Sequence, residues 1–232
     1  MLLFMEITGI IKTVQMKKAI VFGASGFIGS YLVEALLNND QYDKVTIVVR
    51  KNSTVHHPKL TILTGDIDTL TSLKDQIKAE EVFIALGTTK KKTPDQKEYY
   101  RIDHDYPVLA AKIAKDNGAK SVFLVSSIGA NAASGVFYTR TKGKTEQDII
   151  ALNFDHTHIF RPSMLLGNRK ENRPLEKFFL KIWPIISPIF RGTLSRYRGI
   201  EGKEVAQAMQ HAALHQTEKV KIYYWKEMNN LL

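Results

Sequence analysis

Short apolar runs alternate with longer amphipathic stretches along most of this chain. The apolar runs are rich in β-branched residues and are bounded by glycine, asparagine or aspartate, a pattern typical of buried strands. They predict strands over 19–22, 44–49, 61–63, 82–86, 121–125, 157–160 and 220–224. Apolar residues three and four positions apart predict helices over 28–36, 70–77, 108–116, 138–152 and 203–214. This alternation predicts an α/β fold, a doubly wound parallel sheet with helices on both faces.

The pattern changes after residue 162. Three prolines interrupt an apolar and aromatic stretch, so one long helix cannot form there. We expect residues 162–202 to be mainly a small C-terminal substrate lobe over a ligand cleft; core packing and contact with a membrane or partner are the alternatives. Residues 1–16 have no basic segment and no cleavage site, and their apolar run is too short to span a bilayer. We predict an extension over 1–16, either disordered or the product of an upstream start codon, and a single domain over 17–232.

The composition excludes several kinds of chemistry. The chain has no cysteine, so it has no disulfide, no thiolate metal site and no cysteine nucleophile. A cysteine-free chain fits a reducing compartment, and we expect a cytoplasmic location. The net charge of +10 favours anionic ligands, but the basic residues are spread along the chain and nucleic-acid binding is not indicated.

The first predicted strand ends in a Gly-x-x-Gly-x-x-Gly loop, formed by Gly23, Gly26 and Gly29. A strand, such a loop and then a helix is the context in which phosphate groups are bound. Gly23 allows a sharp turn, Gly26 lets backbone N–H groups approach a pyrophosphate, and Gly29 lets the helix pack close to the strand. The N-terminus of the helix adds the positive end of its dipole. A glycine-rich turn without a ligand is the alternative.

A second group of candidate residues follows the fifth predicted strand. Ser126 and Ser127 stand at its carboxyl end, where open α/β sheets bind ligands. Tyr138 and Lys142 are four positions apart in the next helix, so they lie on one face and the ammonium can stabilise a phenolate. Such a tyrosine can give a proton to a carbonyl oxygen or remove one from an alcohol, and a serine hydroxyl can bind the same oxygen.

Together these motifs resemble those of the short-chain dehydrogenase/reductase superfamily. Several blocks are similar to one atypical branch, the Tat-interacting, NADPH-binding oxidoreductase-like proteins and their bacterial relatives. The blocks are Leu86-Gly87-Thr88-Thr89-Lys90, Val125-Ser126-Ser127-Ile128-Gly129-Ala130, Phe137-Tyr138 with Lys142-Gly143, and Phe160-Arg161-Pro162. The likeness runs from Lys17 to beyond Arg169.

The resemblance implies the catalytic roles. Tyr138 would be the acid/base, Lys142 would hold the nicotinamide ribose and favour the phenolate, and Ser127, ahead of Ser126, would polarise the substrate. One residue departs from the superfamily pattern. Asp103 stands where many members carry an asparagine, which puts their proton-relay water chain in doubt here.

The resemblance also implies the cofactor contacts. NAD(P) would bind the glycine loop, including Ser25, Phe27 and Ile28. Asp66 and Ile67 would flank the adenine; Leu86, Gly87 and Thr88 would contact the adenosine ribose and phosphates; Pro162 and Ser163 would lie near the nicotinamide.

The end of the second predicted strand favours one cofactor over the other. An acidic residue there would bind the ribose 2′-hydroxyl of NAD, whereas a cation suits the 2′-phosphate of NADP. Arg50 and Lys51 occupy this place, 21 residues after Gly29. We therefore expect NADP rather than NAD; a solvated pair on a basic protein is the alternative.

These observations predict a Rossmann-like NADP-dependent oxidoreductase that acts on a small carbonyl or alcohol substrate. The alternatives are an NADPH-binding regulatory or redox-sensing protein with little turnover, and an NAD-dependent epimerase of nucleotide sugars. No metal site is expected: the pairs His56–His57 and His156–His158 are interpreted as ordinary or surface histidines, and the latter pair has no evident carboxylate or cysteine partner. Lys90, Lys91 and Lys92 read as a solvated loop, with a place near cofactor phosphates as the alternative. A homodimer is compatible with the sequence.

Overall fold

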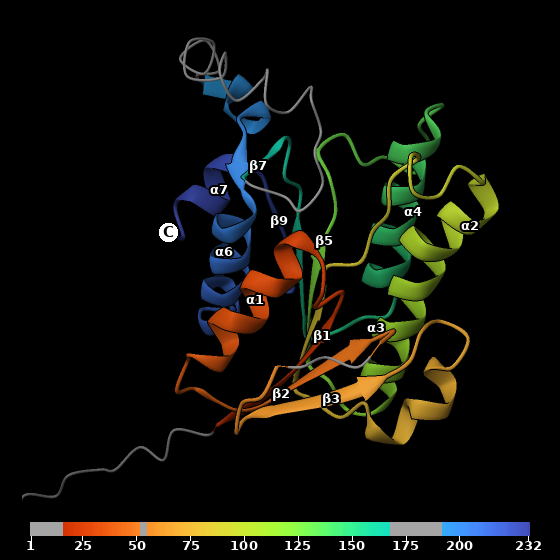
Figure 1. Cartoon of the computed structure of the whole chain (residues 1–232). Coiled ribbons are helices and arrows are strands. Elements are labelled where there is room, and N and C mark those ends of the chain that lie inside the picture. Colours follow the sequence, from red (N-terminus) through yellow and green to blue (C-terminus); the bar gives the residue numbers. More distant parts are fainter. Residues whose placement is uncertain (1–15, 52–54, 168–191) are drawn as a thin grey trace, which may run out of the picture.

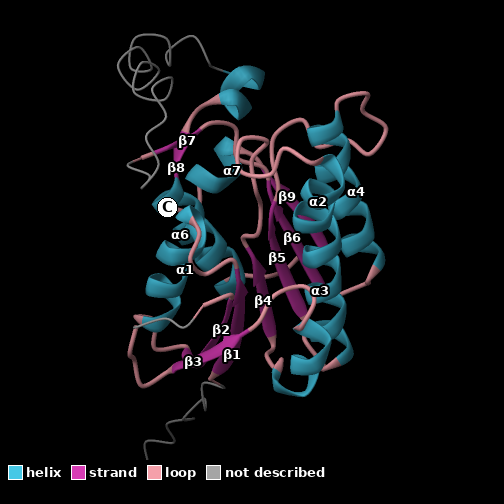
Figure 2. Cartoon of the chain, turned by 45° about the vertical axis from the view of Figure 1, so that its right-hand side comes forward, coloured by secondary structure: helices cyan, strands magenta, loops and turns pink. Residues whose placement is uncertain are grey.

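The computed structural model describes residues 16–51, 55–167 and 192–232. Its centre is a seven-stranded sheet in the order β3-β2-β1-β4-β5-β6-β9, in which every pair of neighbours is parallel (Figures 1 and 2). The strands are β1 Lys17–Phe22, β2 Tyr42–Val49, β3 Leu60–Thr64, β4 Glu81–Ile84, β5 Ser121–Val125, β6 His156–Phe160 and β9 Val220–Tyr223. All seven predicted strands are present.

Side-chain alternation along the strands explains why both faces of the sheet are covered. In β1, Ala19 and Val21 belong to one apolar cluster, and Ile20 and Phe22 belong to the cluster on the opposite face. Successive strand residues point to opposite faces, so an uninterrupted apolar run needs helices on both sides. The doubly wound arrangement that the sequence predicts is therefore confirmed.

The helices form two layers, one on each face of the sheet (Figure 1). One layer contains α1 Phe27–Leu37 and α6 Gly202–Leu214, whose buried residues share a cluster. The other contains α3 Tyr106–Asp116 and α4 Phe137–Ala151. The shorter elements are the 3₁₀ helices η1 Leu70–Gln76 and η4 Gly192–Tyr197, α2 Gln96–Tyr100, the π-helical turn η2 Arg101–Asp105, the paired strands β7 Leu165–Leu166 and β8 Ile200–Glu201, and α7 Trp225–Asn229.

The structure differs from the sequence prediction at several elements. The helix expected over 70–77 is the 3₁₀ helix η1, and α7 follows the last strand. The helix expected from 108 begins at Gln96, because Asp95 Oδ1 accepts the backbone N–H of Glu98 and caps α2 at 2.8 Å. The predictions for residues 1–16 and 162–202 fall largely on residues 1–15 and 168–191, outside the described residues.

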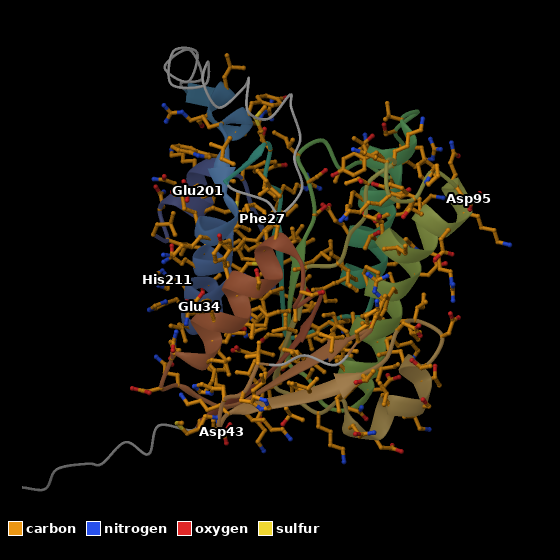
Figure 3. The ribbon with its side chains drawn as sticks, viewed as in Figure 1. Phe27, Glu34, Asp43, Asp95, Glu201 and His211 are labelled. Atoms are coloured by element: carbon orange, nitrogen blue, oxygen red, sulfur yellow. The ribbon has the colours of Figure 1, made fainter. Side chains whose placement is uncertain are left out.

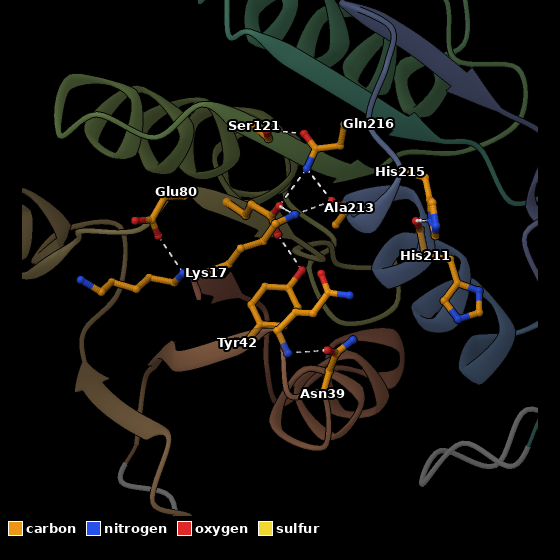
Figure 4. Close-up of polar contacts among 12 residues, drawn as sticks. Lys17, Asn39, Tyr42, Glu80, Ser121, His211, Ala213, His215 and Gln216 are labelled. Carbon is orange, nitrogen blue, oxygen red and sulfur yellow. Dashed lines mark hydrogen bonds and ion pairs between the residues drawn. The ribbon is translucent and has the colours of Figure 1, made fainter. Parts of the chain in front are cut away.

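A buried polar network connects neighbouring strands of the sheet at their amino ends (Figure 4). At its centre is Glu81, 2% exposed, which binds Lys17 Nζ at 2.7 Å, Tyr42 Oη at 2.6 Å and Gln216 Nε2 at 2.8 Å. Burial and the Glu81 carboxylate raise the pKa of Tyr42, so its hydroxyl stays protonated and donates. Lys17 Nζ also donates to Ala213 O at 2.8 Å, so the network joins the end of α6 to β1, β2 and β4. Within the described ranges, no helix combines the length and apolar character needed to cross a membrane.

Candidate active site

A cleft of about 1050 Å³ lies at the carboxyl ends of β1, β4, β5 and β6. Its wall includes eleven of the residues predicted from sequence: Ser25, Gly26, Phe27, Ile28, Leu86, Gly87, Thr88, Ser126, Tyr138, Lys142 and Ser163. The glycine loop and the tyrosine–lysine pair come from distant parts of the chain, yet the parallel sheet brings both to one edge. The structure therefore places both predicted motifs in one site.

The glycine loop needs glycine for two different reasons. Gly23 has φ +89°, and a β-carbon there would lie 2.5 Å from the carbonyl oxygen of Ala85 on the neighbouring strand. At Gly29 a β-carbon would lie 2.1 Å from Gly23 O, so the first turn of α1 rests directly on the loop. Gly26 is the N-cap of α1 and has no side chain to cover the first backbone N–H groups. The positive end of this helix therefore faces the cleft and suits an anion.

Lys142 is buried at the base of the cleft and is paired with Asp103. Its Nζ lies 2.8 Å from Asp103 Oδ1, and the side chains are 8% and 1% exposed. Asp103 Oδ2 accepts the backbone N–H of Thr88 at 2.7 Å. Burial lowers the pKa of Lys142, but Asp103, Tyr138 and Glu146 outweigh burial and raise it above its ordinary value. Lys142 is therefore a charged ammonium at neutral pH.

Tyr138 is the second residue of α4 and is 41% exposed. It lies one helical turn before Lys142, and the two groups interact electrostatically. The Tyr138 hydroxyl is thus accessible from the cleft, while Lys142 is buried. A ligand in the cleft can therefore reach a phenol whose ionised form the fixed Lys142 ammonium can stabilise.

The two serines differ in their surroundings. Ser126 lines the cleft, but its hydroxyl is hydrogen-bonded to Glu146, which also pairs with Arg161. An ionised carboxylate only accepts, so the Ser126 hydroxyl donates its proton away from the cleft. Ser127 is buried outside the cleft wall, and its hydroxyl donates to the carbonyl of Ile128 at 3.1 Å. Both serine hydroxyls therefore donate to acceptors within the protein.

Of the residues predicted to hold the adenosine part of the cofactor, Leu86, Gly87 and Thr88 line the cleft, whereas Arg50, Lys51, Asp66 and Ile67 do not. Arg50 and Lys51 are exposed and follow β2, which neighbours β1, so they share the edge of the glycine loop. Asp66 accepts hydrogen bonds from Thr69, which lower the pKa of its carboxyl group. Burial and Asp66 raise the pKa of Tyr106 to about 12, while Arg50 acts in the opposite sense. Ile67 packs against the apolar cluster, and Pro162 is buried.

Sequence reasoning missed Tyr99 and Asp103 as parts of the cleft wall. Tyr99 is 6% exposed and its hydroxyl donates to Thr88 O at 3.2 Å. The Asp95 to Glu98 spacing could have predicted the short helix that carries it. Asp103 departs from the superfamily pattern, but its pairing with Lys142, 39 positions away, has no local signal in the sequence. The described residues contain no group of three or more His, Asp or Glu side chains that could hold a metal ion.

Fold and site together define an NAD(P)-binding protein of the short-chain dehydrogenase/reductase type. The chain belongs to the NAD(P)H-binding family, whose model matches residues 23–177. Its relatives include FMP52 of Candida glabrata, 36% identical over 87% of each chain, and HTATIP2 of Rattus norvegicus, 33% identical over 71% of each chain. It is therefore an atypical short-chain dehydrogenase/reductase of the HTATIP2-like family, as its motifs predicted.

Solved structures show the same fold. The Bordetella bronchiseptica enzyme WbmH, solved in complex with NAD⁺, superposes with a TM-score of 0.69 over 90% of this chain and 75% of that chain. The identity is 20%, so this likeness establishes the fold and not the reaction.

The cytoplasmic location expected from sequence is contradicted by these relatives. FMP52 proteins of Candida glabrata, Candida albicans and Aspergillus fumigatus are all named mitochondrial. The expectation rested on the absence of cysteine, which fits any reducing compartment and does not distinguish one from another.

Proposed function

We propose that this protein is an NADP-dependent oxidoreductase that interconverts a small carbonyl compound and its alcohol, with Tyr138 as the acid/base. The supporting observation is that Tyr138 and Lys142 line the same cleft as the uncapped N-terminus of α1. When bound, NADPH supplies the hydride for such a reaction.

The residues around the cleft fit the parts of this cofactor. The backbone N–H groups at the start of α1 would bind the pyrophosphate, as helix N-termini bind anions elsewhere. Arg50 and Lys51 would bind the 2′-phosphate that distinguishes NADP from NAD. The exposed phenol of Tyr138 would donate a proton to the carbonyl oxygen during reduction. Ser127 would bind the same oxygen only after its hydroxyl leaves the carbonyl of Ile128.

Calorimetric titration with NADPH and NADH tests the cofactor assignment. We expect NADPH to bind the wild type at least about tenfold more tightly than NADH, because only NADPH carries the 2′-phosphate that Arg50 would bind. Arg50→Ala should weaken NADPH binding by about tenfold and leave the affinity for NADH unchanged. Lys44→Ala, which removes an exposed cation near the other end of β2, is the matched control. Absence of binding by both nucleotides would contradict the proposal.

A second function, NADPH binding with little turnover, is favoured by one observation. Asp103 neutralises the Lys142 ammonium, so this cation supports the Tyr138 phenolate less than an unpaired lysine would. A panel of carbonyl substrates separates the two functions. Tight NADPH binding without net oxidation of NADPH by any carbonyl compound would support the binding protein.

A further inference from the structure

Asp103 lies in η2, the π-helical turn between α2 and α3, and is 1% exposed. A π turn widens the helix and frees a backbone carbonyl from its α-helical partner, a feature common at functional sites. The carbonyl of Asp103 accepts a hydrogen bond from Thr145 Oγ1 on α4 at 2.9 Å. The turn is therefore anchored to α4 at the residue whose side chain reaches Lys142.

Both carboxylate oxygens of Asp103 contact groups of the cleft wall. Oδ1 is 2.8 Å from Lys142 Nζ, and Oδ2 accepts the N–H of Thr88. Gly87 covers the pair, since a β-carbon at this position would lie 3.5 Å from Asp103 Oδ1 and 3.6 Å from Lys142 Nζ. A buried charge is costly unless an opposite charge neutralises it. The carboxylate thus allows Lys142 to remain charged at this depth.

The other titratable groups around the Lys142–Asp103 pair identify which charge acts most directly on Lys142. Tyr99 on α2 and Tyr138 and Glu146 on α4 are the other titratable groups that interact with this pair, and Lys90 and Lys92 in the loop after β4 line the same cleft. Glu146 is bound to Arg161, and burial together with Asp103 raises the pKa of Tyr99, which stays neutral. Among the described residues, Asp103 is the one carboxylate that lines the cleft.

We propose that Asp103 is a positioning residue that holds the Lys142 ammonium beneath Gly87 and limits how strongly this cation stabilises the phenolate form of Tyr138. An asparagine can accept the Thr88 N–H but carries no charge. A carboxylate at this position offsets the charge of the Lys142 ammonium, which favours Tyr138 as a proton donor. The consequence for the reaction, a bias toward carbonyl reduction, rests on the proposed function.

Asp103→Asn tests this role, because it removes the charge and leaves an oxygen for the Thr88 N–H. Asp105→Asn is the matched control: Asp105 is in the same π turn, but its carboxylate contacts His104 at 2.8 Å. Ligand-free protein labelled with ¹³C at tyrosine Cζ and lysine Cε is titrated by NMR. Tyr138→Phe and Lys142→Arg assign the signals. The measured quantity is the first deprotonation of the Tyr138–Lys142 pair, which titrates as a unit.

Loss of a nearby negative charge makes both groups of the pair more acidic. We expect the first midpoint to fall by about one pH unit or more in Asp103→Asn, and by less than about 0.3 unit in Asp105→Asn. If Asp103→Asn fails to fold by circular dichroism, Asp103→Ser removes the same charge and should give the same shift. An unchanged midpoint in the folded variant overturns the proposal. The titration contains no cofactor, so a failure of NADPH binding would contradict the proposed function alone.

Discussion

The ring of Phe27 lies against Gly202, the first residue of α6: a β-carbon at Gly202 would be 2.5 Å from Phe27 Cε1. Gly167, with φ +120°, approaches the same ring: a β-carbon there would lie 3.0 Å from Phe27 Cζ. Figure 3 shows Phe27 at the end of α1 that faces the C-terminal part of the chain. Phe27 also lines the cleft, so one ring connects the glycine loop to α6.

Gly202→Ala should destabilise the protein by about 1–3 kcal/mol, because the added methyl group overlaps the ring and the core must shift. Chemical denaturation measures the change. Gly135→Ala is the matched control, since a β-carbon there meets nothing within 4 Å. Phe27→Leu in the Gly202→Ala background should recover part of the loss; no recovery would show that the ring is not the cause.

Tyr138→Phe should abolish turnover while NADPH affinity stays within about twofold of the wild type. The substitution removes the proton that the phenol supplies and leaves the glycine loop unchanged. Initial rates of NADPH oxidation with an active carbonyl substrate, beside calorimetry, measure the two effects. Turnover equal to that of the wild type would remove Tyr138 from the mechanism.

Ser127→Ala should lower kcat/KM by about a hundredfold, as expected for loss of a donor to the reacting oxygen. Ser126→Ala should act mainly on stability, because the Ser126 hydroxyl donates to buried Glu146. Steady-state kinetics and denaturation of both variants separate the roles. The reverse pattern would assign the substrate contact to Ser126.

Lys17→Met should lower the free energy of unfolding by about 1–3 kcal/mol. It leaves the buried Glu81 carboxylate without its cation, and the penalty is moderated because the Lys17 side chain is 29% exposed. Lys18→Met on the same strand is the control, since Lys18 is exposed. Urea denaturation at neutral pH compares them, and equal losses would show that the Glu81 network adds little.

His158 should make stability fall in mild acid. Its side chain is fully buried, stacks on Phe123 with ring centroids 4.9 Å apart, and is hydrogen-bonded through Nδ1 to Tyr223 Oη at 2.8 Å. Burial, followed by the influence of His156, lowers the pKa of His158 from 6.5 to about 4. Between these values the unfolded chain binds a proton that the folded protein does not. Its contribution is therefore complete above pH 6.5 and is lost as the pH falls toward 4.

The corresponding measurement is urea denaturation at pH 7 and pH 4.5. From the two pKa values, the wild type should lose about 2 kcal/mol more than His158→Phe across this range. His215→Gln changes an exposed histidine and should behave like the wild type. The same acid dependence in His158→Phe would place its origin in other groups.

The elements and their order could be predicted from sequence because their signals are local. Apolar runs and three-to-four spacings mark strands and helices, and a parallel sheet must gather its carboxyl ends at one edge. Gly23 to Gly29 and the Tyr138–Lys142 pair each lie within a few residues, so their geometry follows from one turn or one helix. The cleft they form together was predictable for this reason.

The partners of the charged side chains were decided only by tertiary packing. Lys142 meets Asp103 because α4 packs against the π turn η2, and Ser126, just after β5, meets Glu146 of α4. Lys17 and Glu81 are 64 positions apart and meet through strand register. Periodicity specifies which face of an element is buried, but the pairing of polar groups across that face depends on angstrom-scale packing of elements distant in sequence. The sequence by itself thus determined the fold, the glycine loop and the Tyr138–Lys142 pair. The tertiary structure decided which charged side chains pair with one another.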